Sequence, residues 1–391
     1  MSMEARVRKI GEACFWIALV IELIIVIIDK SAYINPYEGQ LFRITFLLFG
    51  IKIVTTKFTA KEWFCIFIVG ILASCSYFIN EKDEVVRAVV FVVSCKDISL
   101  KKNIKVIFYI TLIGCMTLIL LSVTGIYGVI SMTAEFGDRQ IQTRYTLGMG
   151  HPNALHCMVW MLMMLGMYLY ESTMKWYHFL ILFVMNIVLY LFTDSNTGMI
   201  MAALSVIGVA MLHYFPKLQD VSWVYWSGAG IVAFCVVFSM IGAHIGSGWE
   251  IGNKFMEKLD KILNGRYESC YRVLEARLTN WKLFAAPENQ EYFDAGFVRA
   301  FYWYGIIPGG MYVLMHFYLI WQSYKRKDDI LLVMVVAFSI YNLMEAHFIS
   351  IYLLRNYLLV FMGYYWYQPF EEKQEKEGYL WQVPKILLQR S

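Results

Sequence analysis

Long apolar stretches alternate with short polar ones along almost the whole chain. A membrane-spanning helix needs about 20 mainly apolar residues to cross roughly 30 Å of hydrocarbon. About twelve stretches approach this requirement, and we predict a span in each: 11–28, 41–55, 62–79, 84–98, 106–123, 154–170, 178–193, 198–214, 223–243, 300–322, 330–347 and 350–367. The pattern therefore predicts an all-α polytopic membrane protein with one transmembrane domain over 1–367 and a tail over 368–391.

The composition agrees with this class. Hydrophobic residues make up 59% of the chain and charged residues 16%, which excludes an ordinary soluble domain. Seven of the eight cysteines fall in predicted spans and Cys270 stands alone, so neither a disulfide framework nor a CxxC metal site is expected. We expect no nucleic-acid partner, because the net charge of +4 follows from basic residues in the inner loops.

The short loops predict the orientation, since lysine and arginine collect on the cytoplasmic side of a membrane. With the N-terminus inside, the predicted inner segments hold most of the basic residues, whereas the outer loops before residue 245 hold chiefly Lys30, Lys82, Arg139 and Arg144. Twelve spans then leave both termini in the cytoplasm. Two long loops, 124–153 and 245–299, face outside, and the tail offers a short interfacial helix near 379–388 as an alternative to a solvated segment.

Residues 245–299 form the one long stretch that cannot be a span, because they carry 16 charged side chains. The periodicity predicts an amphipathic helix over 253–264 that suits the membrane surface, then a second helix from Arg266 to about Phe284. Arg266 and Arg277 are eleven residues apart, close to three helical turns, so they share one edge of that helix. Arg272 is expected on the opposite, solvated face.

Two arginines on one edge can bind a phosphate or diphosphate through paired hydrogen bonds. Pairing with loop carboxylates or with lipid headgroups is the simpler alternative for each arginine. The other outer loop ends in Arg144-Tyr-Thr-Leu-Gly-Met-Gly-His151-Pro152-Asn153, a structured turn that offers an arginine, an imidazole and backbone N–H groups. Its structural interpretation is a turn in which Asn153 caps the next helix and His151 is exposed.

Further polar residues are predicted at the same outer face. Glu345 and His347 end one span and Arg355 begins the next, where ionisable groups are costly unless they are paired or functional. An ion pair between Glu345 and Arg355 is the structural alternative. Asp294, before the tenth span, and the turn Asp194-Ser-Asn-Thr-Gly198 also lie on this side.

These motifs, in this order, resemble one family. Gly-His-Pro-Asn opens a span, Asp-Ser-Asn-Thr-Gly follows two spans later, a long outer loop contains Asn-Gly-Arg, and Asp-Ala-Gly-Phe and Glu-x-His-Phe come after it. Over residues 84–367 the chain looks like the Wzy-type polymerases of bacterial capsular or exopolysaccharide repeat units, in the O-antigen polymerase and ligase superfamily.

The resemblance implies an integral-membrane glycosyltransferase of the bacterial cytoplasmic membrane. Such an enzyme polymerises undecaprenyl-diphosphate-linked oligosaccharides on the outer face, releases undecaprenyl diphosphate, and works beside membrane lipids, a flippase and a chain-length regulator. We expect Arg144, Arg266 and Arg277 to bind the diphosphate. His347, Glu345, Asp294 and His151, in this order, are candidates for the catalytic base, with Pro152 and Asn153 as structural turn residues and with no cofactor or metal.

Two alternatives stay open. A ligase of the same superfamily would pass the glycan to another acceptor, and the sequence barely separates it from a polymerase. A transporter, such as a flippase for lipid-linked oligosaccharides, is favoured by charges inside predicted spans: Glu12, Glu22, Arg43, Lys52 and Arg87. Against it, the charges gather at the outer face and no internal repeat is evident.

Overall fold

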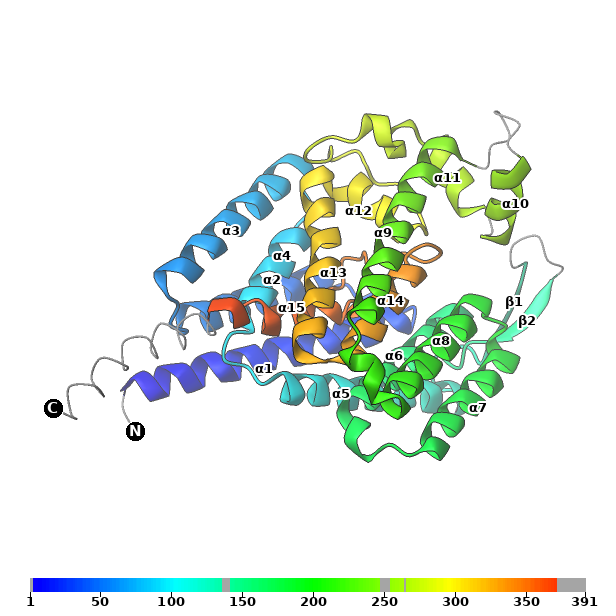
Figure 1. Ribbon diagram of the computed structural model, residues 1–391, viewed down its shortest axis with the longest axis horizontal. Helices are drawn as coiled ribbons and strands as arrows, with labels where there is room; N and C mark the ends of the chain where they lie inside the picture. The colour runs from blue at the N-terminus through cyan, green and yellow to red at the C-terminus, as the bar shows by residue number, and fades with distance from the viewer. Residues whose placement is uncertain (1–2, 136–140, 247–253, 264, 371–391) are drawn as a thin grey trace.

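The computed structural model describes residues 3–135, 141–246, 254–263 and 265–370. Within these ranges the chain folds into α-helices with one small β-hairpin (Figure 1). Seven helices are long and apolar enough to cross a membrane: Met3–Lys30, Ala60–Asn80, Leu100–Val123, Pro152–Thr173, Trp176–Thr193, Asn196–Tyr214 and Ser222–Ile245. The chain is therefore a helical membrane protein.

Every apolar stretch of the sequence coincides with helix over at least part of its length. The first nine helices are α1 Met3–Lys30, α2 Glu38–Val54, α3 Ala60–Asn80, α4 Glu84–Ser94, α5 Leu100–Val123, α6 Pro152–Tyr170, α7 Trp176–Thr193, α8 Asn196–Tyr214 and α9 Ser222–Ile245. The rest are α10 Lys254–Ile262, α11 Arg266–Arg272, α12 Gly296–Tyr304, α13 Ile306–Arg326, α14 Asp329–Tyr341 and α15 Leu358–Tyr365. Their boundaries carry local signals, such as the capping box that Thr59 and Glu62 form at the start of α3.

The last three predicted spans are not continuous helices. The stretch 300–322 breaks at Gly305, whose φ of +100° favours glycine and where a Cβ atom would lie 2.5 Å from Phe284 Cα. The stretch 330–347 is helical only as far as Tyr341. The stretch 350–367 contains one 3-10 turn and α15, whose eight residues would extend about 12 Å at 1.5 Å per residue.

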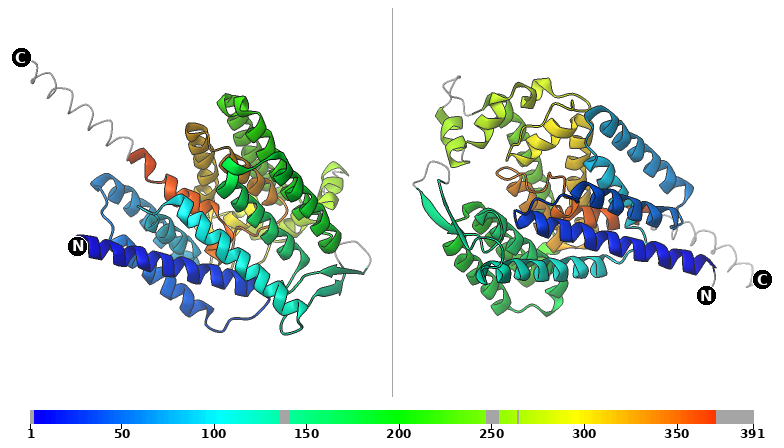
Figure 2. Two further views of the ribbon diagram at one scale, coloured as in Figure 1. Left: turned by 90° about the horizontal axis from the view of Figure 1, so that it is seen from below. Right: turned by 180° about the vertical axis from the view of Figure 1, so that it is seen from behind.

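The helices enclose one large apolar core. Trp160 of α6 is fully buried there, and its indole N–H donates to Ser205 of α8 at 2.9 Å. Phe338 and Phe348 stack with their ring centroids 4.0 Å apart. α14 contacts α6, α8, α9 and α13, so its C-terminal end is held in the middle of the molecule (Figure 2). This position matters because the residues after Tyr341 carry candidate functional groups.

Polar connections gather at two opposite ends of the helices. At one end Lys96 pairs with Glu62 at 2.6 Å, and Lys327 pairs with Asp220 at 3.5 Å. At the other end Gly150 donates its backbone N–H to the carbonyl oxygen of Lys30 at 2.8 Å. The hairpin and the helices α10 and α11 lie at this second end (Figure 1).

The hairpin was not predicted. Its strands, β1 Ser131–Ala134 and β2 Gln142–Tyr145, are antiparallel with Met132 opposite Arg144. α10, Lys254–Ile262, covers the amphipathic helix predicted over 253–264 except at its ends. Residues 247–253, 264 and 371–391, including the alternative interfacial helix near 379–388, lie outside the described residues.

Candidate functional site

The first residue of α11, Arg266, is held in place by its neighbours in the chain. Asp260 of α10 caps α11, because its carboxylate accepts hydrogen bonds from the backbone N–H groups of Tyr267 at 2.9 Å and Glu268 at 3.0 Å. The hydroxyl of Tyr267 donates to the carbonyl oxygen of Leu343 at 3.3 Å. These bonds fix Arg266 beside the segment that follows α14.

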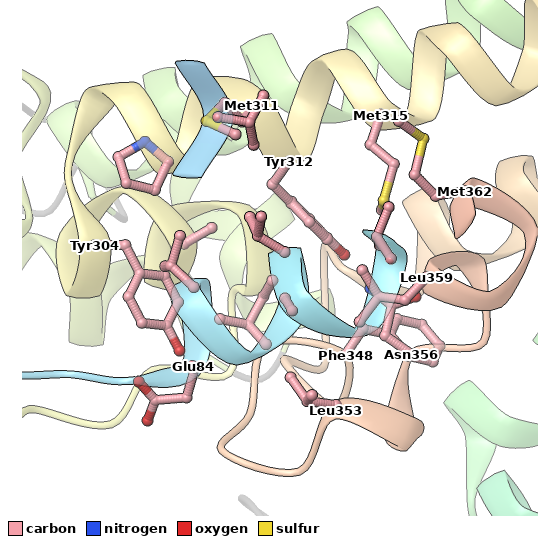
Figure 3. A pocket seen from close by; sticks show the side chains of 18 of the residues that line it. Glu84, Tyr304, Met311, Tyr312, Met315, Phe348, Leu353, Asn356, Leu359 and Met362 are labelled. Atoms are coloured by element: carbon pink, nitrogen blue, oxygen red, sulfur yellow. The ribbon is translucent and has the colours of Figure 1, made fainter. Parts of the chain in front are cut away.

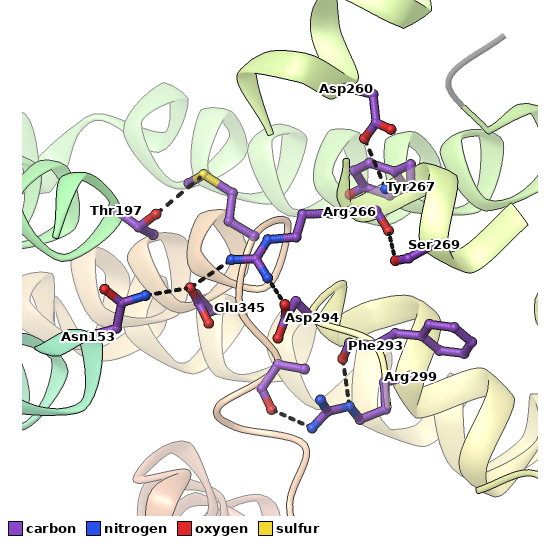
Figure 4. A network of polar contacts seen from close by, with 12 residues as sticks. Asn153, Thr197, Asp260, Arg266, Tyr267, Ser269, Phe293, Asp294, Arg299 and Glu345 are labelled. Carbon is purple, nitrogen blue, oxygen red and sulfur yellow. Dashed lines mark hydrogen bonds and ion pairs between the residues drawn. The ribbon is translucent and has the colours of Figure 1, made fainter. Parts of the chain in front are cut away.

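Arg266 joins three distant parts of the chain (Figure 4). Its Nη2 lies 3.0 Å from Glu345 Oε1, and its Nη1 forms an ion pair with Asp294. Asn153 donates from Nδ2 to the same Glu345 oxygen at 3.3 Å. We call Asn153, Arg266, Asp294 and Glu345 the Arg266 cluster. The sequence analysis named all four residues but did not predict that they touch one another.

The Arg266 cluster is partly closed to solvent. The side chain of Arg266 is 18% exposed and that of Glu345 16%. Arg266 Nε is buried and has no hydrogen-bond partner among the described residues. A buried guanidinium N–H without an acceptor is unfavourable.

Arg299 of α12 holds the backbone on both sides of the Arg266 cluster, and it was not among the residues predicted from the sequence. Its side chain is 1% exposed and donates to three backbone carbonyls, those of Phe293 at 2.8 Å, Ala346 at 3.3 Å and Ile349 at 2.9 Å. Arg299 therefore fixes both the backbone before Asp294 and the backbone after Glu345. The signal that could have revealed it is an arginine at the start of an apolar stretch, where a charge needs partners.

A glycine lets α12 approach the end of α14. The backbone N–H of Gly296 donates to the carbonyl oxygen of Asn342 at 2.7 Å. A Cβ atom at Gly296 would lie 2.4 Å from Asn342 Oδ1. The Asp-Ala-Gly-Phe motif thus has a packing reason for its glycine, and the close approach brings Asp294 to the segment that carries Glu345.

The Gly-His-Pro-Asn motif starts α6, but its roles differ from the structural interpretation above. His151 is the N-cap and accepts the backbone N–H of Asn153 at Nδ1, 3.1 Å away, while Pro152 is the first helical residue. The side chain of Asn153 is thereby available to Glu345. His151 is exposed, as expected. Partial desolvation of the ring, and then the charges of Arg144, Arg266 and Lys30, lower the pKa of His151.

Arg144 connects the hairpin to the turn between α7 and α8. Its Nη2 lies 2.7 Å from Asp194 Oδ2 and also donates to Gln142 Oε1 at 2.9 Å. Asp194 adopts a left-handed conformation with φ +45° at the end of α7. The Asp-Ser-Asn-Thr-Gly turn therefore positions the second arginine of the site, and both arginines act electrostatically on His151.

The alternative ion pair between Glu345 and Arg355 does not form. Arg355 pairs with Asp29 at the end of α1, and Glu345 pairs with Arg266.

His347 lies two residues beyond Glu345, outside the Arg266 cluster. Its ring packs against Tyr341, with centroids 6.5 Å apart, and against Phe348 at 5.5 Å.

The predicted helix from Arg266 to Phe284 is also wrong. α11 ends at Arg272, and two 3-10 turns, Leu274–Ala276 and Leu278–Asn280, follow it. Arg277 therefore does not share a helix edge with Arg266. Its Nε donates to the carbonyl oxygen of Tyr271 at 2.8 Å, and its guanidinium lies 3.8 Å from the centroid of that ring. Arg272 is 74% exposed and pairs with Glu268, as its expected solvated position requires.

An apolar cavity of about 180 Å³ begins beside the segment that Arg299 holds (Figure 3). Phe348 and Ile349 line it, together with residues of α3, α4, α12, α13 and α15. Glu84 and Tyr304 lie at one end of this cavity in Figure 3. A largely hydrocarbon space thus adjoins the polar residues around Arg266.

The arrangement offers two arginines, two carboxylates and an imidazole in one region, which suits an anionic group next to a proton acceptor. Among the described residues no group of three His, Cys, Asp or Glu side chains could hold a metal ion. Comparisons with protein-family models, curated proteins and solved structures found no match for this chain.

Proposed function

We propose that this protein is a polysaccharide polymerase of the bacterial cytoplasmic membrane that joins undecaprenyl-diphosphate-linked repeat units on the outer face. One observation carries the proposal: Arg266 bonds Glu345 and Asp294, and Asn153 bonds the same Glu345 oxygen. These residues come from four separate motifs of the family that the sequence resembles. Four motifs far apart in the chain thus supply one contiguous polar cluster.

The proposed topology keeps twelve membrane-crossing segments with both termini in the cytoplasm. The basic residues of the short loops support this orientation. It assigns the hairpin, the segment 245–299 and the Arg266 cluster to the outer side. The short helices α14 and α15 cross only together with the non-helical segments beside them, which protein surrounds rather than lipid.

The reaction joins an acceptor sugar to the anomeric carbon of the donor glycan. The acceptor hydroxyl oxygen forms the new bond to that carbon, and the bond from carbon to the diphosphate oxygen breaks. The diphosphate leaves with the bonding electron pair, and Arg266 and Arg144 stabilise its charge. The hydroxyl proton passes to a catalytic base, for which we place the Glu345 carboxylate ahead of the His347 imidazole because Glu345 directly contacts Arg266.

The apolar cavity beside the cluster supports a lipid-linked substrate. Its lining includes Phe348, Ile349 and Leu353, just beyond Glu345 in the chain. A diphosphate at Arg266 would leave its hydrocarbon chain near this apolar wall, where burial is favourable at about 25 cal/mol per Å². A soluble sugar nucleotide has no hydrocarbon chain that could bind in such a cavity.

Deletion of the gene tests the proposal in cells. Lipid-linked single repeat units should accumulate on the outer leaflet, and the ladder of long polymer chains should disappear from gels. Accumulation on the inner leaflet would instead identify a flippase. Continued polymer synthesis, with loss only of transfer to a final acceptor, would identify a ligase.

A further inference from the structure

A second cavity lies outside the Arg266 cluster and the candidate membrane helices. Its volume is about 460 Å³, and it is lined by residues of the segment 273–291 together with Phe301 and Tyr302 of α12. Carboxylate, amide and ammonium groups surround an indole ring in its lining. In the proposed topology this cavity opens to the outer aqueous side.

The walls of this cavity are built by specific bonds. The ring of Trp281 stacks on Phe301, with centroids 4.6 Å apart and planes at 1°, and its N–H donates to the carbonyl oxygen of Ala276 at 2.9 Å. Asn280 and Asn289 donate from their Nδ2 atoms to backbone carbonyls, each at 2.7 Å. The indole and both amides are therefore fixed, and both amide oxygens remain acceptors.

Four charged side chains complete the lining: Glu275, Lys282, Glu288 and Glu291. None of them forms a hydrogen bond or ion pair within the part of the chain that the structure describes. Because the lining holds three carboxylates and one ammonium, its negative charge disfavours the binding of a phosphate or another anion. Among the described residues, these carboxylates do not form a group of three that could hold a metal ion.

The combination of groups fits a neutral, hydroxyl-rich ligand with an apolar face. Sugar hydroxyls can donate to the carboxylates and amide oxygens and accept from the ammonium, while the C–H face of a sugar ring packs on an aromatic ring. The volume falls within the range of about 300–1,000 Å³ that is typical of ligand pockets.

We propose that this cavity is a glycan-binding site that retains part of the growing polysaccharide between transfer steps. The inference rests on the proposed polymerase function. α12 connects the two sites, because the ring of Tyr302 packs on Phe293 with centroids 5.0 Å apart and Phe293 immediately precedes Asp294. A chain held at this cavity therefore stays close to the cluster where the next bond forms.

The test uses purified full-length protein and a defined probe, the free oligosaccharide released by mild acid from the lipid-linked units of a deletion strain. Titration calorimetry measures its binding to the wild type and to the double variant Glu275→Ala/Glu288→Ala. Because two charge-assisted hydrogen bonds are lost, affinity should fall roughly tenfold or more. In cells the same variant should give a ladder of shorter chains while the first linkage still forms.

Lys258→Ala is the matched control, because Lys258 is an exposed charge of the same segment on α10. Its oligosaccharide affinity and its ladder should equal those of the wild type. If the wild type polymerises lipid-linked units but the double variant equals this control in both readouts, the glycan site is wrong and the polymerase stands. If the wild type makes no polymer, the proposed function fails and this inference fails with it.

Discussion

Replacement of Arg266 by alanine removes the one side chain that touches both carboxylates of the cluster. The side chains of Arg266 and Glu345 are 18% and 16% exposed, so their ion pair is intermediate between a surface pair and a buried pair. Surface pairs contribute about 0–1 kcal/mol to stability, whereas disruption of a buried pair costs about 3–5 kcal/mol. We therefore expect a loss of about 2 kcal/mol in the free energy of unfolding. The rate of polymer formation should fall by about 10²-fold or more, as when a donor to a developing anion is removed.

The assay compares polymer ladders from membranes that contain equal amounts of inserted protein, with melting temperature measured on purified samples. Arg272→Ala is the control, because Arg272 lies in the same helix, is 74% exposed and pairs with Glu268 at 3.1 Å. That change should cost about 0.3–0.5 kcal/mol and leave the ladder intact. Arg266→Lys keeps the charge but cannot span both carboxylates, so it should behave like the alanine variant. A normal ladder from Arg266→Ala would refute the assignment of diphosphate binding to this residue.

Two further changes give distinct expectations. Arg144→Ala should also abolish the ladder at normal insertion levels, and normal chain lengths would remove Arg144 from the site. Gly296→Ala places a Cβ atom 2.4 Å from Asn342 Oδ1 and should lower stability by about 1–3 kcal/mol, whereas Gly310→Ala, with no atom within 4 Å, should not lower it; equal melting temperatures would contradict this.

Hydropathy predicted where helices occur but not where the later ones end. The predicted span 330–347 extends to His347, yet the helix stops at Tyr341. The carbonyls of Ala346 and Ile349 instead accept hydrogen bonds from Arg299. Arg299, which is distant in sequence, thus provides the hydrogen bonds that these two carbonyl groups do not receive from a helix. No local sequence pattern reveals this interaction.

Periodicity failed in the same way beyond Arg272. The apolar spacing from Tyr267 to Trp281 fits a helix, but Val273, Arg277 and Trp281 have extended backbones between 3-10 turns. Side-chain bonds replace the helical ones, as in the bond from Asn280 to the carbonyl oxygen of Leu274. The spacing of apolar residues indicates which side chains can be buried. It does not indicate which donors form hydrogen bonds with the backbone carbonyl groups.

Candidate residues were easier to predict than their partners. Asn153, Asp294 and Glu345 were chosen because each lies at the predicted outer face, and all three contact one another or Arg266. The pairing of Arg355 with Asp29 was not foreseeable, because charges adjacent in sequence are not the ones that the helix packing brings together. Arg277 shows the converse, since its predicted place depended on a helix that does not form.

The most direct test incubates the purified protein, in lipid vesicles, with its undecaprenyl-diphosphate-linked repeat unit and no other protein. We expect a ladder of polymer and the release of undecaprenyl diphosphate, one molecule for each bond formed, with the wild type and Arg272→Ala active and Arg266→Ala inactive. Movement of the intact lipid-linked unit across the vesicle membrane, without any new glycosidic bond, would contradict this expectation.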